Sequence, residues 1–340
     1  MMAVKLNKAI GLNSALNAED FTRLGKDTSL VLLCHQRPDG DALGSLLGLG
    51  LWLRSLGLSA HLLCPDAYPK NLSFLPQSSE LAILEYQATH WEALIEGADL
   101  VVLLDHSRRD RGGESAAKAL QKRTGPVWMI DHHPEPESFD KCLHRISASS
   151  TCELVCELLQ KEKLNTEMAT ALMCGLLTDT GGFKHAVRSE TFQAAARLLQ
   201  SGVNYPELST QIFDTNSLQR LKLTGFALKD RLQQHPDLPL AWMVLTHKDV
   251  LDYKIESGDT EGLVNYTLSI AGNKMGLLFQ EKDPGITRIS FRSKGDCVVN
   301  QMAERFFSGG GHKNAAGGRY NGTAEEAEAF FLSIISEQFA

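Results

Sequence analysis

The sequence predicts an α/β protein whose N-terminal part is built on a parallel sheet. From residue 29 to about residue 130, short β-type runs alternate with amphipathic helical stretches, as expected for strands joined by crossover helices. The chain has 340 residues, 43% of them hydrophobic, which is more than one core usually organises. Three of the apolar runs end in polar clusters. We therefore expect two domains, with a functional site at the carboxyl ends of the strands.

The N-terminal domain is expected to span residues 1–232. The β-type runs predict strands at 29–34, 60–64, 100–104 and 127–130. A helix over residues 42–56 forms the first crossover. After residue 147 the apolar spacing becomes helical, which predicts helices at 150–161, 166–177, 190–199, 205–213 and 217–231.

A linker and a smaller α/β domain follow. Residues 233–239 contain two prolines and interrupt the helical pattern, which is typical of a linker. The second domain is expected over residues 240–340, across a cleft from the first. Its elements are strands at 241–246, 276–280 and 287–292 and helices at 261–270, 298–307 and 324–338.

Composition narrows the classes of partner and compartment. A formal charge of −7 and a pI near 5.9 argue against binding to long duplex nucleic acid, which needs a basic surface, but leave small anionic substrates open. Seven scattered cysteines without a C-x-x-C pair favour free thiols in a reducing cytosol. The uncharged stretch 42–53 is too short to span a bilayer, and residues 1–15 lack the apolar segment of a signal peptide. We expect a cytoplasmic protein without membrane association.

Imidazole and carboxylate groups gather at the ends of the predicted strands. His35, Asp39 and Asp41 lie within seven residues, on a turn made by Pro38 and Gly40. Such closely spaced carboxylates repel one another unless a cation lies between them. The same ligand types recur at Asp105, at Asp131, His132 and His133, and at Asp179. Together these clusters predict a site for divalent metal ions.

The ligand types indicate which ions and which chemistry fit. Nitrogen and oxygen ligands without thiolate suit Mn²⁺, Mg²⁺, Co²⁺ or Zn²⁺, and the excess of carboxylates favours Mn²⁺. The groups suffice for two ions with one carboxylate as a bridge, and such a pair suits in-line displacement at phosphorus. The sequence has no G-x-S-x-G elbow and no Walker pattern. Hydrolysis of a phosphoester or a phosphoanhydride is therefore expected.

Two further features of the sequence suggest contacts with phosphate. Gly309, Gly310 and Gly311 precede His312, and such a backbone can approach an anion closely, although a plain loop is the alternative. Arg292 ends an alternating strand and could hold a terminal phosphate with two parallel hydrogen bonds, or lie at a solvated edge.

A basic run follows Asp105 and leaves two interpretations open. Arg108, Arg109 and Arg111 could contact phosphate, since they lie near a predicted metal ligand. They could equally pair with Asp110 and Glu114 on an exposed helix.

These motifs resemble the DHH phosphoesterase superfamily, which is named for the run Asp131-His132-His133. The order and spacing of the four motifs are those of the family, over His35, Pro38, Asp39, Gly40, Asp41, Ala42, Gly44 and Ser45, then Asp105, then Asp131, His132, His133 and Pro134, then Asp179, Thr180 and Gly181. The segments 290–293 and 309–318 resemble the associated DHHA1 domain. The length and the two-domain plan are most similar to the nano-RNase A type, a bifunctional oligoribonuclease and 3'-phosphoadenosine 5'-phosphate (PAP) phosphatase.

The resemblance implies a role for each residue of the site. One metal is then held by His35, Asp39 and Asp105 and the other by Asp41, Asp105, His132 and Asp179. His133 contacts the scissile phosphate or its leaving oxygen. Asp131 supports the ligands or replaces one of them. His106 stands where the family has a small residue, and it is either a supporting partner or a surface residue.

The expected function is that of a manganese-dependent phosphodiesterase or phosphomonoesterase. Its substrates would be very short oligonucleotides and small phosphorylated nucleotides such as PAP or linear dinucleotides, because the acidic chain offers no extended basic track. The second domain would capture the distal phosphate through Arg292, Gly310, Gly311 and His312. The alternatives are a polyphosphate or pyrophosphate hydrolase and a non-catalytic nucleotide sensor. A homodimer is also left open.

Overall fold

The computed structural model describes residues 14–256 and 258–335, and the chain divides between Thr215 and Asn216 into two units. Residues 1–13, on which the expectation of no signal peptide largely rests, lie outside the described residues, as do residues 336–338 of the last expected helix. No helix in the described part of the chain has both the length and the apolar character needed to cross a membrane.

A seven-stranded parallel sheet forms the centre of the N-terminal unit, which confirms the predicted fold class. Its strand order is β1-β7-β6-β5-β2-β3-β4. The strands are β1 (Ser14–Ala15), β2 (Leu30–Leu33), β3 (Ala60–Cys64), β4 (Ala82–Ile83), β5 (Leu100–Leu104), β6 (Val127–Asp131) and β7 (Lys141–His144). The four buried apolar strands were predicted. The sequence pattern did not predict β1, β4 and β7, which are short or only partly buried.

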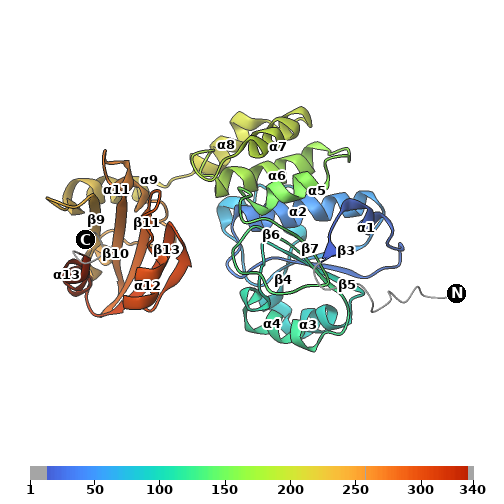
Figure 1. Ribbon diagram of the computed structural model, residues 1–340, viewed down its shortest axis with the longest axis horizontal. Helices are drawn as coiled ribbons and strands as arrows, with labels where there is room; N and C mark the ends of the chain where they lie inside the picture. Colours follow the sequence, from blue (N-terminus) through green and yellow to red (C-terminus); the bar gives the residue numbers. More distant parts are fainter. Residues whose placement is uncertain (1–13, 257, 336–340) are drawn as a thin grey trace. The chain divides into compact units, whose positions relative to one another are not determined.

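Helices cover both faces of this sheet (Figure 1). One face carries α1 (Ala18–Thr22) and α2 (Gly40–Ser55), with α5 (Thr151–Leu158) and α6 (Thr166–Asp179) packed on α2, and α7 (Ser189–Gln200) and α8 (Tyr205–Phe213) beyond them. The other face carries α3 (Ala88–Gly97) and α4 (Gly113–Lys122). Short 3₁₀ helices lie at Lys70–Leu72, Ser78–Glu80, Leu84–Gln87 and Arg109–Gly112.

Helix α2 lies between the sheet and α6 and is buried on all sides from Gly40 to Leu53. This explains why the helix is apolar around its whole circumference. Glycine lets the two helices approach closely, since a Cβ at Gly44 would lie 2.4 Å from the carbonyl oxygen of Ala171. The start of α2 and the end of α6 are thereby brought together.

The C-terminal unit contains a six-stranded mixed sheet in the order β12-β13-β11-β10-β9-β8. Only β9 and β10 pair in parallel. The strands are β8 (Leu232–Gln234), β9 (Leu240–Leu245), β10 (Met275–Asp283), β11 (Ile286–Ser293), β12 (Gly310–His312) and β13 (Ala315–Asn321). The helices are α9 (Leu218–Phe226) with a π-helical end (Ala227–Arg231), α10 (His247–Asp252), α11 (Asn265–Ser269), α12 (Asn300–Phe306) and α13 (Ala324–Ile335).

The division between the units falls earlier in the chain than the expected linker. Leu223 and Ala227 of the segment 217–231 pack in one buried cluster with Met243 and Leu245 of β9, so this segment belongs to the C-terminal unit. Residues 233–239 are the end of β8 and the turn into β9. The two prolines thus lie in a hairpin within the C-terminal unit and not in a linker between domains. Apolar contacts across the turn join the two sides of this hairpin.

Candidate metal centre

The site lies at the carboxyl ends of β2, β5 and β6, three neighbouring strands of the parallel sheet. His35 follows β2, Asp105 follows β5, and His132 and His133 follow β6. The start of α2 adds Asp39 and Asp41, and the end of α6 adds Asp179. Residues from five separate elements therefore meet at one edge of the sheet.

Three overlapping groups of side chains in the described part of the chain have the composition of a metal site. In each group the ligand atoms lie within 4.8 Å of one another. The groups are His35, Asp39 and Asp105; Asp105, His132 and His133; and Asp41, His132 and Asp179. Asp105 and His132 each belong to two groups, so neighbouring ions could share ligands.

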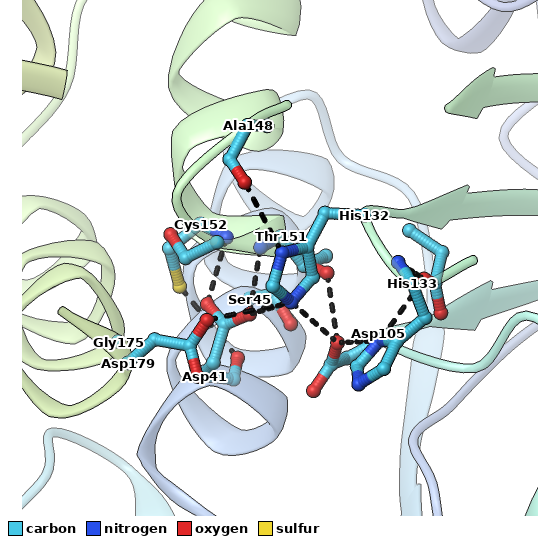
Figure 2. Close-up of polar contacts among 12 residues, drawn as sticks. Asp41, Ser45, Asp105, His132, His133, Ala148, Thr151, Cys152, Gly175 and Asp179 are labelled. Atoms are coloured by element: carbon cyan, nitrogen blue, oxygen red, sulfur yellow. Dashed lines mark hydrogen bonds and ion pairs between the residues drawn. The ribbon is translucent and has the colours of Figure 1, made fainter. Parts of the chain in front are cut away.

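Asp105 lies at the centre, with one carboxylate oxygen toward each side of the site. Its Oδ2 is 3.2 Å from Nε2 of His35. Its Oδ1 is 3.2 Å from Nδ1 of His133 and 3.7 Å from Nε2 of His132 (Figure 2). The Thr151 hydroxyl donates to the same Oδ1 at 3.0 Å. The backbone of Asp105 has a φ of 56°, a left-handed conformation that is uncommon for residues other than glycine. Residues in this conformation are often found at functional sites.

Two histidines are held so that Nε2 faces the carboxylates. Nδ1 of His35 lies 2.8 Å from the carbonyl oxygen of Gln36, and Nδ1 of His132 lies 3.3 Å from that of Ala148. A carbonyl only accepts, so Nδ1 carries the proton in each ring. When such a ring is neutral, Nε2 is the atom with the lone pair that a metal needs. This is the arrangement in which backbone contacts orient metal-binding imidazoles.

The carboxylate of Asp41 is held by the N-terminus of α5. It accepts hydrogen bonds from the backbone N–H groups of Thr151 and Cys152, at 2.6 and 2.9 Å (Figure 2). Glycine at position 175 leaves room for it, since a Cβ there would lie 2.9 Å from Oδ1 of Asp41. The contribution of Thr151 and Cys152 was missed in the sequence. Its only signal is Ser150, three residues before Glu153, the pattern of a helix N-terminus.

The pKa values show that negative charge is crowded here. Burial and then the charge of Asp105 raise the pKa of Asp41 to about 6. Burial and then the charges of Asp41 and Asp105 also raise the pKa of Asp179. Burial opposes ionisation of Asp105 as well, but hydrogen bonds from His133 and His35 lower its pKa overall. A cation would relieve this repulsion, so the donor set fits a divalent metal.

His133 and Asp131 form a pair beside the metal groups. Asp131 is fully buried, and its Oδ1 accepts hydrogen bonds from the backbone N–H of His133 and, at 3.1 Å, from Nδ1 of the same residue. Burial lowers the pKa of His133, but hydrogen bonds to Asp105 and Asp131 outweigh burial and raise it to about 10. Asp131 is in none of the three groups, and it contacts His133 instead.

The structure distinguishes the three arginines that follow Asp105. Nη2 of Arg108 lies 3.0 Å from Asp110, and Nη1 of Arg109 lies 2.7 Å from Glu137. Arg111 instead turns toward the site. Its Nη1 donates to the carbonyl oxygen of Asp105 at 3.0 Å, and its Nη2 lies 3.3 Å from Nε2 of His133.

His106 is buried, so its interpretation as a surface residue is wrong. Its ring packs under the backbone of Gly112, where a Cβ would lie 2.8 Å from Cε1 of His106. Burial, together with the positive charge of Arg111, lowers the pKa of His106 to about 3. The ring is therefore neutral.

The candidate substrate-binding residues of the C-terminal unit lie on one sheet. Arg292 is half-buried on β11, and its Nη1 donates to the carbonyl oxygen of Phe291 at 2.9 Å. Gly310, Gly311 and His312 form the edge strand β12 rather than a loop. In the backbone register, Arg292 and His312 flank Ala315 of β13 from opposite sides. They therefore occupy one row across three neighbouring strands.

Comparison with known families agrees with this geometry. Residues 29–176 match the DHH family N-terminal domain, and residues 242–340 match the DHHA1 domain. The two matches correspond to the two units and confirm the family that the motifs suggested.

Relatives of similar length and a solved structure extend the comparison. The chain is 32% identical to the bifunctional oligoribonuclease and PAP phosphatase NrnA of Bacillus subtilis, over 85% of this chain and 88% of that one. It is 30% identical to the protein of the same name from Thermus thermophilus, over 91% and 90%. The crystal structure of an exopolyphosphatase-related protein from Bacteroides fragilis superposes with a TM-score of 0.89 at 31% identity, over 94% of both chains. The chain thus belongs to the DHH family of phosphoesterases and carries a DHHA1 domain at its C-terminal end.

Proposed function

We propose that this chain is a two-metal phosphoesterase that hydrolyses very short oligonucleotides and small phosphorylated nucleotides such as PAP. The proposal on substrates is supported by the two relatives named for both activities, each matched over most of its length. The proposal on the metals rests on Asp105, which presents one oxygen to His35 and the other to His132 and His133. A carboxylate in that position is suited to bridge two cations.

These contacts support the ligand assignment that the family resemblance implies. One ion would be held by His35, Asp39 and Asp105, and the other by Asp41, Asp105, His132 and Asp179. Oxygen and imidazole ligands with a majority of carboxylates favour Mn²⁺. The chemistry that such a pair supplies is polarisation of the phosphoryl oxygens and a lowered pKa for an attacking water.

The residues around the ligands have separate tasks. Asp131 orients His133 through Nδ1. Nε2, which lies 3.3 Å from Nη2 of Arg111 in the structure, would contact the scissile phosphate or its leaving oxygen when the substrate is bound. Thr151 fixes the carboxylate of Asp105. On the C-terminal unit, Arg292 and the strand Gly310–His312 hold the terminal phosphate of the substrate.

Charge and thiols support the substrate size and the compartment. The net charge of −7 disfavours long polyanions, so we assign short ones. All seven cysteines are free thiols, five of them buried, which fits a reducing cytosol.

Phosphoanhydride hydrolysis is the second candidate. It is favoured by the name of the superposed Bacteroides fragilis protein, and the same ligand set would serve both bond types. A panel with Mn²⁺ separates the two: di- to pentanucleotides, PAP, linear and cyclic dinucleotides, pyrophosphate and polyphosphate. We expect release of mononucleotides from the shortest oligomers and of phosphate from PAP. Release of phosphate from polyphosphate alone would overturn the assignment, and a preparation of Asp105→Asn controls for contaminating nucleases.

A further inference from the structure

A pocket of about 440 Å³ adjoins the metal groups on the side of His35. Its wall contains two arginines and a metal ligand, and it is formed by His35, Gln36, Arg37, Asp110 and Arg111. The volume is within the range of small-molecule sites, about 300–1,000 Å³. We call it the arginine pocket. Apart from the ligand role of His35 and the phosphate contact left open for Arg111, no role assigned above uses it.

Arg111 is fixed at the inner side of the pocket. Its side chain is 26% exposed, and hydrogen bonds to the carbonyl of Asp105 and to His133 hold one edge of the guanidinium. Its backbone carbonyl accepts from the N–H of Gln36 at 2.7 Å, which ties the two loops of the pocket together. Oδ2 of Asp131 lies 3.6 Å away and balances part of the charge.

Arg37 presents a second, exposed cation. Its backbone has a φ of 55°, and the following residue is Pro38, so the turn holds the backbone in a rarely adopted conformation. The N–H of Arg37 donates to Oδ1 of Asp66 at 2.6 Å, which stabilises the turn. Among the residues that the structure describes, its guanidinium makes no ion pair.

The acidic residue in the wall does not cancel this charge. Both oxygens of Asp110 are engaged by Arg108, at 3.2 and 3.0 Å, and this pair faces solvent. The pocket therefore presents two guanidinium groups beside a metal ligand, that of Arg111 partly balanced by Asp131 and that of Arg37 without an ion pair among the described residues. Guanidinium is the side-chain group that best matches the oxygens of a phosphate.

We propose that the arginine pocket is a phosphate site, in which Arg111 and Arg37 donate to the oxygens of a phosphoryl group next to the ligands of the metal centre. The proposal rests on the proposed function and deepens it. Its ligand is a phosphate group, either the scissile group of the substrate, which is a diester monoanion in an oligonucleotide and a monoester dianion in PAP, or the inorganic phosphate released from PAP. Arg111 would touch the phosphoryl group undergoing cleavage, since it already contacts both Asp105 and His133.

Binding of inorganic phosphate to the manganese-loaded full chain tests the site. Calorimetric titration compares the wild type with Arg37→Gln and Arg111→Gln, and with Arg23→Gln as a control. Arg23 pairs with Glu19 on an exposed helix, so its loss removes the same charge elsewhere. We expect the Kd for phosphate to rise about tenfold in each pocket variant and to stay unchanged in the control. Equal manganese content, measured on each protein, shows that the metal site is intact.

Kinetics with PAP and a dinucleotide distinguish the two sources of phosphate. If the pocket holds the phosphoryl group of the substrate, both pocket variants lower kcat/KM about tenfold. Arg111→Lys then recovers only part of the lost kcat/KM, because an ammonium group cannot form the two parallel hydrogen bonds of a guanidinium. If it holds released phosphate, only product inhibition weakens. A Kd for phosphate within twofold of the wild type in both variants would overturn the proposal. Wild-type protein that binds phosphate but cleaves nothing in the panel would instead refute the proposed function alone.

Discussion

The two units organise their candidate residues in opposite ways. In the N-terminal unit, side chains from five elements, Asp105 among them, meet at one edge of the sheet, where backbone groups hold Asp41 and His132. In the C-terminal unit, Arg292 and His312 lie in one row across the antiparallel strands β11, β13 and β12, near the edge of the mixed sheet. Crowded carboxylates require a support for every ligand, whereas a phosphate contact requires only donors at the correct spacing.

This contrast predicts different consequences of substitution. The pKa values of Asp41 and Asp179 are raised because their charges are buried together without a cation. Changes there should alter metal binding, turnover and stability at once. Changes at Arg292 should alter substrate binding alone.

The largest expected effect is the loss of Asp105, the proposed shared ligand. Asp105→Ala removes the carboxylate that faces both ligand groups, so kcat should fall by about 10⁴-fold or more, with a loss of bound manganese. Turnover of a linear dinucleotide and metal content by atomic emission measure the two effects.

Asp110→Ala is the matched control for this substitution. Asp110 is exposed and paired with Arg108, so its loss should leave manganese content unchanged. Near-normal turnover in the Asp105 variant would exclude a bridging role.

Manganese affinity should depend strongly on pH. Because the folded protein raises the pKa of Asp41 to about 6, protons compete with the cation below that pH. Affinity should fall about tenfold per pH unit for each proton displaced, or roughly 10²-fold between pH 6 and pH 4. Titrations in buffers of different ionisation enthalpy count the protons released. A flat affinity across that window would show that Asp41 does not bind the ion.

The sequence alone predicted the four main strands and the clustering of the candidate ligands. Buried parallel strands have continuous apolar runs, and polar residues at their ends must share one edge of the sheet, as His35 and Asp105 do. The family follows from the order of the same motifs.

Other features depend on tertiary contacts and could not be predicted from the sequence. Nothing local marks the N–H groups of Thr151 as partners of Asp41, which lies 110 residues away. Arg111 turns toward His133, whereas Arg108 and Arg109 pair with carboxylates instead. The sequence does not distinguish these three arginines, because all of them lie in one short turn. The boundary between the units also depends on packing, since Leu223 joins the core of β9.

A smaller effect is expected at the C-terminal unit. Arg292→Ala should raise KM for PAP and dinucleotides about tenfold and leave kcat within a few-fold, because two charge-assisted hydrogen bonds to phosphate are lost. Arg288→Ala is the control, since Arg288 is exposed on the same strand. A fall in kcat with unchanged KM would place Arg292 in the chemical step instead.

The smallest effect concerns stability without metal. The folded state raises the pKa of Asp179, so it binds the proton more tightly than the unfolded chain and loses stability as pH rises above the unfolded pKa. Asp179→Asn should therefore stabilise the metal-free protein by about 1 kcal/mol at pH 8, with no gain at pH 3, where both states are protonated. Thermal unfolding at the two pH values measures this difference. Manganese should stabilise the wild type more than the variant, because the variant lacks one of the proposed ligands. An equal loss of stability at both pH values would mean that Asp179 has a structural packing role. Repulsion between buried charges would then not be the reason why the site needs a cation.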